Sequence, residues 1–125
     1  MIFARAIVKG EPDTLPFTAD FQYYDKSDEQ IFYNSVQMIK EKVNNNLKIN
    51  TNEALVLYCA YIVDSLRQEK SVQEIQEHGS KILSADKVMI GVPETLRRIT
   101  FDVNVDKFPA NKLILDQPIP ITNFV

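Results

Sequence analysis

Apolar residues recur along the chain with two different periods, and the period separates helical from extended parts. In the middle of the chain, Leu55, Tyr58, Ile62 and Leu66 stand three or four residues apart. This spacing puts all four on one face of a helix. Further apolar residues widen the face, so the helix is expected to be covered on more than one side. We therefore expect this helix to lie at the centre of the core.

Polar residues mark where this helix and the next one begin. Asn50 followed by Glu53, and Ser71 followed by Glu74, are capping boxes, in which each side chain can bond the other residue's backbone amide. The first box starts the long apolar helix. The second predicts a short helix that ends near Gly79, since glycine suits the position just past a helix.

A further helix is predicted on the N-terminal side, opened by a third capping box over residues 27–30. Three asparagines at 44–46 favour a turn, so this helix should pair antiparallel with the helix that begins at Asn50. Its apolar stripe consists of Ile31, Phe32, Ser35, Val36, Ile39 and Val43.

A Gly-Pro break follows the helices. Ser84 is expected to cap a third short helix over Ala85 to Ile90. Gly91 can terminate this helix, and Pro93 cannot continue it. The helical part of the chain should therefore end here.

Both ends of the chain show extended patterns. Residues 1–8 and 15–24 favour strands separated by a turn at 10–13. Beyond residue 100, apolar Phe101, Val103 and Val105 alternate with polar residues, which is typical of a half-buried strand.

A partner strand for that C-terminal strand is expected over 112–115, after a turn at 107–111. Pro118 and Pro120 then favour an extended tail.

These elements predict an α+β fold, with a cluster of four helices packed on a small antiparallel β-sheet and an extra N-terminal strand or hairpin. We divide the chain into an N-terminal extension, residues 1–25, and a main domain, residues 26–125. The predicted core is Ile31, Val36, Ile39, Leu55, Tyr58, Ile62, Leu66, Ile75, Ile82, Val88, Phe101, Val103 and Leu113.

Composition narrows the class of protein. The 125 residues are 45% apolar and 25% charged, which is ordinary for one globular domain. The net charge of −3 argues against a nucleic-acid-binding protein, which needs a basic face. No apolar run approaches the ~18 residues of a membrane span. The single cysteine excludes an internal disulfide, and with no signal-peptide pattern the expected location is cytoplasmic.

Few side chains suggest chemistry. His78 is the only histidine, and with Glu74, four residues earlier on a helix, it would form only a weak two-ligand metal site; a functional site usually takes three or more protein ligands. Cys59 lies within the apolar helix and is predicted to be a core residue rather than a nucleophile. Arg97 and Arg98 favour a solvated turn or an ion pair between subunits. We therefore predict no catalytic, cofactor-binding or metal-binding residue in this chain.

Several strings resemble the gamma subunit of urease, in order and in spacing. The most specific is Val88 to Glu94, which reads Val-Met-Ile-Gly-Val-Pro-Glu. The resemblance covers roughly Ser27 to Ile119. The other strings are Asn50 to Ala54, Lys70 to Val72, Phe108-Pro109, Lys112-Leu113 and Pro118-Ile119.

The chain also departs from the family pattern, mainly at turns and termini. Thr51 stands where the family usually has proline, Glu69 where it has glycine, and Asp116 where it has histidine. The turn after Phe108-Pro109 is one residue shorter. Residues 1–25 precede the family pattern altogether. The chain is thus identified as a divergent member with an N-terminal extension.

The resemblance implies a structural role. In ureases the dinuclear nickel centre, the carbamylated lysine that bridges it and the mobile flap histidine belong to the alpha subunit, and the gamma subunit packs against alpha. The resemblance therefore implies that this chain is a non-catalytic subunit of a nickel hydrolase that splits urea to ammonia and carbamate. Its implied partners are urease alpha and beta subunits, with self-association as a trimer or another homo-oligomer.

Two alternatives to this role stay open. One is a stand-alone urease-gamma-like assembly or interaction protein with no enzyme activity. The other is a small-molecule or metal binder that uses Glu74 and His78. The N-terminal extension likewise has two interpretations: it packs on the domain's own sheet, or it forms an arm that adds a strand to a neighbouring subunit.

Overall fold

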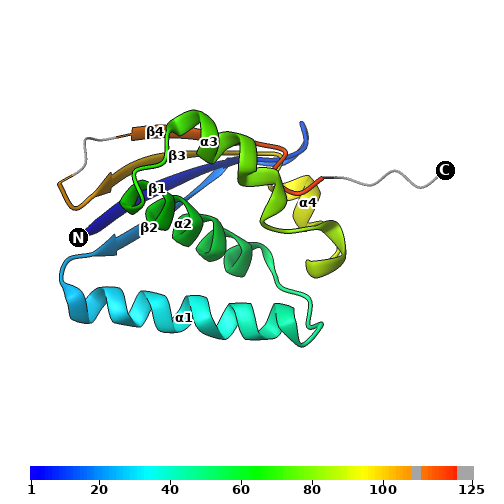
Figure 1. Ribbon diagram of the computed structural model, residues 1–125. Coiled ribbons are helices and arrows are strands. Elements are labelled where there is room, and N and C mark those ends of the chain that lie inside the picture. Colours follow the sequence, from blue (N-terminus) through cyan, green and yellow to red (C-terminus); the bar gives the residue numbers. More distant parts are fainter. Residues whose placement is uncertain (108–110, 121–125) are drawn as a thin grey trace.

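A computed structural model describes residues 1–107 and 111–120 of the chain. Four strands form one antiparallel sheet, in the order β2-β1-β3-β4. They are β1 (Ile2–Lys9), β2 (Phe17–Tyr23), β3 (Arg98–Val105) and β4 (Asn111–Asp116). The N-terminal strand β1 therefore pairs with β3, from the C-terminal part of the chain, in the centre of the sheet (Figure 1).

Alternation of side chains explains why these segments form strands. Ile2, Ala4, Ala6 and Val8 of β1 are buried, and the residues between them are more exposed. β3 alternates in the same way, and Ala6 of β1 lies opposite Phe101 of β3. The small alanine leaves room for the large ring on the buried face. The predicted N-terminal hairpin and C-terminal strands are thus confirmed, and both lie in one sheet.

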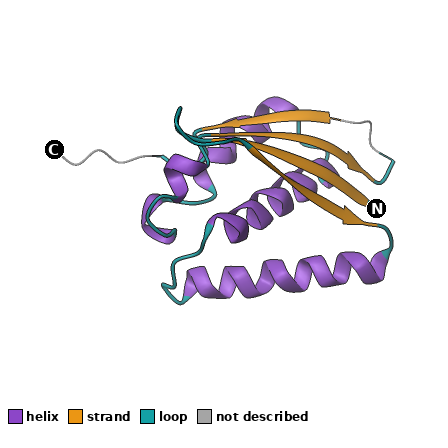
Figure 2. Cartoon of the chain, turned by 180° about the vertical axis from the view of Figure 1, so that it is seen from behind, coloured by secondary structure: helices purple, strands orange, loops and turns teal. Residues whose placement is uncertain are grey.

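The helices cover the buried face of this sheet. α2 (Thr51–Arg67) lies between the sheet and α1 (Lys26–Asn44), and the two helices run antiparallel, as predicted (Figures 1 and 2). α3 (Val72–His78) packs near β4. Two 3-10 turns, η1 (Gly79–Lys81) and η2 (Ala85–Lys87), and the single-turn α4 (Val92–Thr95) complete the helical layer. The predicted α+β fold is confirmed.

The predicted helix starts agree with the structure at α2 and α3, and the complete predicted capping box forms at α2. At α2, the Glu53 amide donates to Asn50 Oδ1 (2.8 Å) and the Asn50 amide donates to Glu53 Oε1 (3.1 Å). At α3, Ser71 accepts from the Glu74 amide. The box predicted at residues 27–30 is wrong, because α1 begins two residues earlier with Asp25 and Asp28 as its capping pair.

The helix predicted over Ala85 to Ile90 is also wrong. Only the 3-10 turn η2 forms there, and Val88 then pairs with Ile49 as an isolated β-bridge. Ser84 bonds the side chain of Asp86 instead of a helical amide. The Lys87 carbonyl and the Met89 amide bond Ile49 in the loop between α1 and α2, so these two groups have partners without an α-helix.

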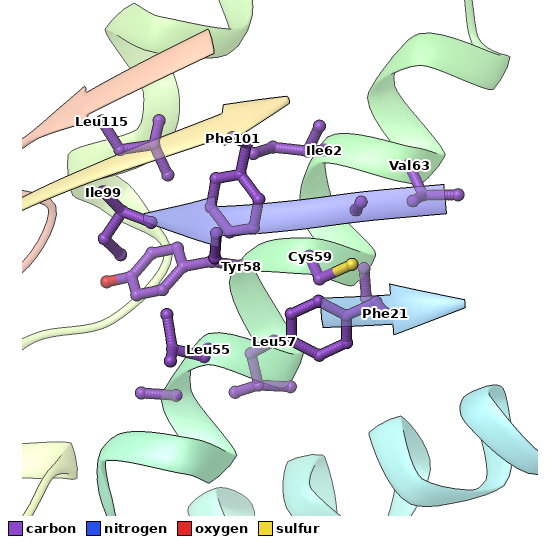
Figure 3. Close-up of a cluster of buried hydrophobic side chains, with 14 of the residues drawn as sticks. Phe21, Leu55, Leu57, Tyr58, Cys59, Ile62, Val63, Ile99, Phe101 and Leu115 are labelled. Atoms are coloured by element: carbon purple, nitrogen blue, oxygen red, sulfur yellow. The ribbon is translucent and has the colours of Figure 1, made fainter. Parts of the chain in front are cut away.

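α2 forms the centre of the core, as its pattern predicted. Tyr58, Ile62 and Leu55 point from α2 towards Phe101 and Ile99 of β3 (Figure 3). No hydrogen-bond partner lies near the Tyr58 hydroxyl among the described residues. Cys59 is buried here, and burial raises the pKa of its thiol to about 12. It is thus a core thiol, as predicted.

One residue of the predicted core is wrong. Ile31 is 65% exposed, and Phe32 takes its place. The rings of Phe21 and Tyr23 meet the Phe32 ring at centroid distances of 6.4 and 4.8 Å. Because consecutive helical residues are ~100° apart, burying Phe32 turns Ile31 outwards.

The remaining predicted core residues are buried, except that Ile82 is only partly buried against the core. The turn predicted at 107–111 includes residues 108–110, which lie outside the described residues, as do the last five residues of the predicted tail. No helix in the described ranges is long and apolar enough to cross a bilayer.

Candidate interaction surface

A short turn after η2 presents apolar side chains to solvent. We call residues 88–91 the Ile90 turn. Ile90 is fully exposed, the most exposed large apolar side chain among the described residues, and Met89 is 47% exposed. Single exposed apolar residues are common on protein surfaces. What distinguishes this pair is the way in which the backbone holds it.

Hydrogen bonds on both sides fix the Ile90 turn. The Ile49 amide donates to the Lys87 carbonyl (3.1 Å), and the Met89 amide donates to the Ile49 carbonyl (2.9 Å). These bonds join the turn to the loop between α1 and α2. Leu47 in that loop is also exposed, so two linked segments place apolar side chains at this end of the molecule.

Gly91 sets the direction in which the chain leaves the turn. Its φ of 93° lies in the left-handed region, which glycine adopts without the strain that a Cβ would bring. The Val92 amide donates to the Met89 carbonyl (3.2 Å), and Thr95 bonds the Gly91 carbonyl through both its amide and its hydroxyl (3.0 and 2.8 Å). α4 therefore begins directly after the turn and braces it.

Charged residues flank the Ile90 turn. The Ser84 hydroxyl bonds the Asp86 carboxylate and is the main cause that lowers its pKa; Lys87 and Lys48 act in the same direction. Two lysines thus lie near this carboxylate, beside the exposed apolar pair. An apolar anchor with a charged rim is typical of a surface that contacts another protein.

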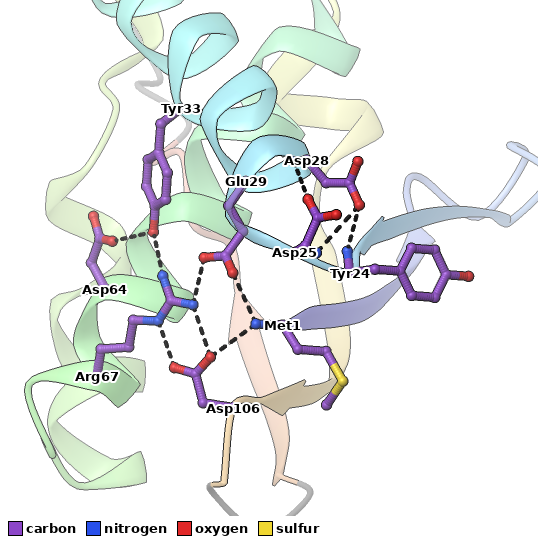
Figure 4. A network of polar contacts seen from close by, with 9 residues as sticks. All are labelled: Met1, Tyr24, Asp25, Asp28, Glu29, Tyr33, Asp64, Arg67 and Asp106. Atoms are coloured by element: carbon purple, nitrogen blue, oxygen red, sulfur yellow. Dashed lines mark hydrogen bonds and ion pairs between the residues drawn. The ribbon is translucent and has the colours of Figure 1, made fainter.

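A second cluster joins four elements at the opposite end of α2, and we call it the Arg67 network (Figure 4). Arg67 donates to Glu29 (2.6 Å) and, with two nitrogens, to Asp106 (2.9 and 3.1 Å). It also donates to the Tyr33 hydroxyl (3.1 Å). The amine of Met1 donates to the same two carboxylates (2.8 and 3.0 Å).

The Arg67 network shifts the protonation of its members. The hydrogen bond from Arg67 is the main cause that lowers the pKa of Asp106. Burial alone would raise the pKa of Glu29, but the hydrogen bonds from the Met1 amine and Arg67 outweigh it, so this pKa is also lowered. Hydrogen bonding to Asp106 raises the pKa of Arg67. The network thus holds both carboxylates charged and ties α1, α2, β1 and the end of β3 together.

Replacing Arg67 by methionine (Arg67→Met) should lower the free energy of unfolding by about 1–2 kcal/mol at neutral pH, because Glu29 and Asp106 lose a charged donor. Carboxylates with lowered pKa values contribute stability above their unfolded pKa of about 4, and this stability is lost as the pH falls through the folded pKa. The difference between wild type and variant should therefore shrink in acid. Urea unfolding at neutral and acidic pH measures it.

Arg5→Met is the matched control, since Arg5 forms an exposed pair with Asp20 and such pairs contribute little. A difference that stays constant with pH for Arg67→Met would contradict the role given to the two carboxylates.

The side chains that the sequence suggested for chemistry do not gather into one site in the described part of the chain. Glu74 and His78 are both exposed on α3. Across residues 1–107 and 111–120, no three His, Cys, Asp or Glu side chains come together in a group that could hold a metal ion. Arg97 bonds Glu11 (3.0 Å) and Arg98 bonds Asp116 (3.3 Å), so both arginines form ion pairs within the chain.

The exposure of Ile90 was missed from the sequence, because the residue was assigned to the end of a helix. The Gly91-Val92-Pro93 break was the available signal. A left-handed glycine directly after an isoleucine is also compatible with a surface turn.

Comparison with known proteins gives a consistent family. Residues 23–118 match the family model described as "Urease, gamma subunit". The chain is 36% identical over 63 residues to a urease subunit gamma of Halalkalibacterium halodurans, covering 50% of this chain and 63% of that protein. It is 28% identical over 96 residues to a urease subunit gamma of Shewanella halifaxensis, covering 75% of this chain and 93% of that protein.

Proposed function

We propose a function from one premise, that this chain belongs to the urease gamma subunit family: it is a non-catalytic structural subunit of a urease-type complex. The observation that carries the proposal is the match over residues 23–118, which includes α1 to α4, β3 and β4. Its partners on this proposal are urease alpha and beta subunits, in a cytoplasmic complex. Self-association as a trimer or another homo-oligomer belongs to the same proposal.

The chemistry belongs to another subunit in this proposal. In this family nickel sits on the alpha subunit. The described part of this chain brings no three metal donors together, so its residues do not fit a nickel site by themselves. Its contribution is to bind and hold the subunit that performs the reaction.

The Ile90 turn is the surface that we assign to the large subunit. It lies within the family match. In the isolated chain its backbone conformation is fixed by hydrogen bonds with Ile49 and by the left-handed φ of Gly91. A pre-organised apolar side chain loses little conformational entropy when it enters a pocket. Lys48 and Lys87 beside it favour a pocket with an acidic rim.

The proposal is tested by affinity purification of the tagged full chain from its native cell, with the partners identified and urea hydrolysis assayed in the eluate. A large subunit with nickel-dependent activity should co-elute. Recovery of the chain alone, without activity, would instead favour the stand-alone assembly or interaction protein.

Ile90→Asp should reduce recovery of the large subunit at least tenfold, equivalent to about 1.4 kcal/mol of binding free energy, because a charge replaces the apolar anchor. The fold should be unchanged, since the Ile90 side chain makes no part of the core. Leu15→Asp is the matched control: Leu15 is 89% exposed and lies outside the family match. Equal recovery with both variants would refute the surface assigned here.

A further inference from the structure

The sheet has two outer strands, and only one of them is covered. α3 packs along β4, where Gln76 donates to the Ile114 carbonyl (3.0 Å) on the outer edge. Gly79 lies so close to β4 that an added Cβ would stand 2.8 Å from Leu115. At the other end of the sheet, no strand pairs with the outer side of β2 among the described residues.

The direction of the backbone N–H and C=O groups on β2 follows from the hydrogen-bond pattern between β1 and its two neighbouring strands. The Asp106 amide donates to the Met1 carbonyl (2.9 Å), so Met1 turns its peptide groups towards β3. Because these directions alternate along a strand, Ile2, Ala4, Ala6 and Val8 turn theirs towards β2. Their register partners Tyr23, Phe21, Ala19 and Phe17 complete that ladder.

The peptide N–H and C=O groups of Thr18, Asp20 and Gln22 therefore point away from β1, towards solvent at the open edge of the sheet. The next residue in the alternation, Tyr24, agrees with this, since its amide donates to the Asp28 carboxylate (3.0 Å) rather than to β1. No described residue bonds the outward groups of the other three. We call these three residues the β2 edge. It offers three donors and three acceptors to an added strand.

The β2 edge lacks the features that usually prevent strand addition. Proteins protect open edges with lysine, proline, bulges or a covering element. β2 contains no lysine or proline within Phe17–Tyr23. Its single charge, Asp20, is held by Arg5 through two hydrogen bonds (2.7 and 3.1 Å). An approaching strand thus meets no free charge on the β2 edge.

An apolar surface lies next to the β2 edge on α1. Ile31 lines a hollow of about 230 Å³ together with Gln22, Tyr23, Tyr24 and Asp28. Met38, seven residues further along α1, is also exposed, and this spacing places it on the same side of the helix. The open edge and the exposed side of the adjoining helix therefore form one continuous surface.

We propose that this surface binds a second copy of this chain, through antiparallel pairing of the two β2 strands across a two-fold axis. The product is a continuous eight-stranded sheet. Two-fold pairing places the same edge on both sides of the interface, so donors and acceptors match. It also places the two α1 helices on one face of the sheet, where their Ile31 sides meet and lose contact with water.

Two observations favour a second copy over another subunit. The family match begins at residue 23, so the β2 edge lies outside the region shared with the relatives, and subunits that recognise the shared region do not require it. Charge also permits self-pairing. With Asp20 opposite Gln22 of the partner subunit, no like charges face each other directly, which would be unfavourable.

The test is sedimentation equilibrium of the purified full chain at micromolar concentrations. The expected mass is twice the chain mass of 14.4 kDa. Gln22→Pro removes one outward N–H donor and leaves the hydrogen bonds between β2 and β1 intact. Ile31→Glu places a carboxylate on each copy where the two α1 helices would meet. Each should raise the dimer dissociation constant at least about tenfold. Lys112→Pro is the matched control, because it removes an outward donor from β4 at the opposite edge of the sheet.

Every outcome decides the proposal. Circular dichroism first shows that the variants keep the wild-type fold; if Gln22→Pro unfolds, Ile31→Glu carries the test alone. A monomeric wild type, a trimer, or a dimer that survives in the folded edge variants would overturn it, as would a dimer that dissociates in Lys112→Pro alone. The measurement uses the isolated chain, so its result does not depend on whether a large subunit co-purifies.

Discussion

Deleting residues 1–23 is expected to abolish the folded state of the isolated chain. The N-terminal hairpin supplies Ile2, Ala4, Ala6, Val8 and Phe21 to the core. Burial of a large apolar side chain contributes about 1.5–3 kcal/mol, and the total stability of a domain is only about 5–15 kcal/mol. The deletion also exposes the edge of β3 that pairs with β1 along its whole length. Circular dichroism and thermal unfolding should show no cooperative transition.

A point variant separates loss of the hairpin from general effects of truncation. Ala6→Asp places a carboxylate at a fully buried position facing α2, and an uncompensated buried charge costs about 3–5 kcal/mol. Ile7→Asp is its control, because Ile7 is the next residue of β1 and faces the opposite, exposed side of the sheet. A truncated chain that unfolds cooperatively with a native spectrum would show that the hairpin is an appendage.

Most of the N-terminal hairpin lies outside the region that the chain shares with its family. The family match starts at residue 23, near the end of β2. The matched region alone contains β3 and β4 but lacks β1, which pairs with the other side of β3, and nearly all of β2, which pairs with β1. In this chain the N-terminal hairpin fills that place from within. Edges that are filled within the chain are not available to a strand from another subunit.

Phe101→Ala is expected to lower the free energy of unfolding by about 3–5 kcal/mol, the range typical of removing a buried ring. Phe101 is completely buried at the centre of β3, opposite Ala6 of β1 and Leu113 of β4. Neither alanine at position 6 nor the fixed backbone of two paired strands can fill the resulting cavity. Urea unfolding measures the change.

Asn104→Ala is the matched control for this variant, since Asn104 lies on the same strand but on its exposed face. We expect a change within about 0.5 kcal/mol for such a surface site. A loss of less than about 1 kcal/mol for Phe101→Ala would mean that the core closes around the missing ring, contrary to the packing in Figure 3.

The sequence predicts the buried residues better in some elements than in others. In β1 and β3 the period of two leaves a single buried face, so the alternation alone predicted Phe101 and Val103 correctly. In α1 the apolar residues Ile31 and Phe32 are adjacent, and both fit a helical stripe. The aromatic rings of β2 decide between them, because the Phe32 ring packs against Phe21 and Tyr23 in the core, and Ile31 is left 65% exposed.

The candidate interaction surface could be predicted less well than the fold. The string Val88 to Glu94 drew attention to the right segment, yet its helical assignment concealed that Ile90 faces solvent. The decisive contact is the bridge between Val88 and Ile49. It joins residues about 40 positions apart, and a contact at such a distance leaves no local period in the sequence.

Apart from the helix expected over Ala85 to Ile90, the sequence by itself determined the strand and helix types, and it also determined the start of α2 at Asn50, the burial of Cys59 and the family. These follow from local periodicity, from capping between residues three apart and from matching strings, all of which the chain carries in its order of residues. Only the tertiary structure decided that the N-terminal hairpin docks in its own sheet, that β4 is covered while β2 is open, and that Ile90 is exposed. An alternating pattern is the same for a strand that pairs within its own chain and for one that pairs with another, so the choice depends on long-range contacts.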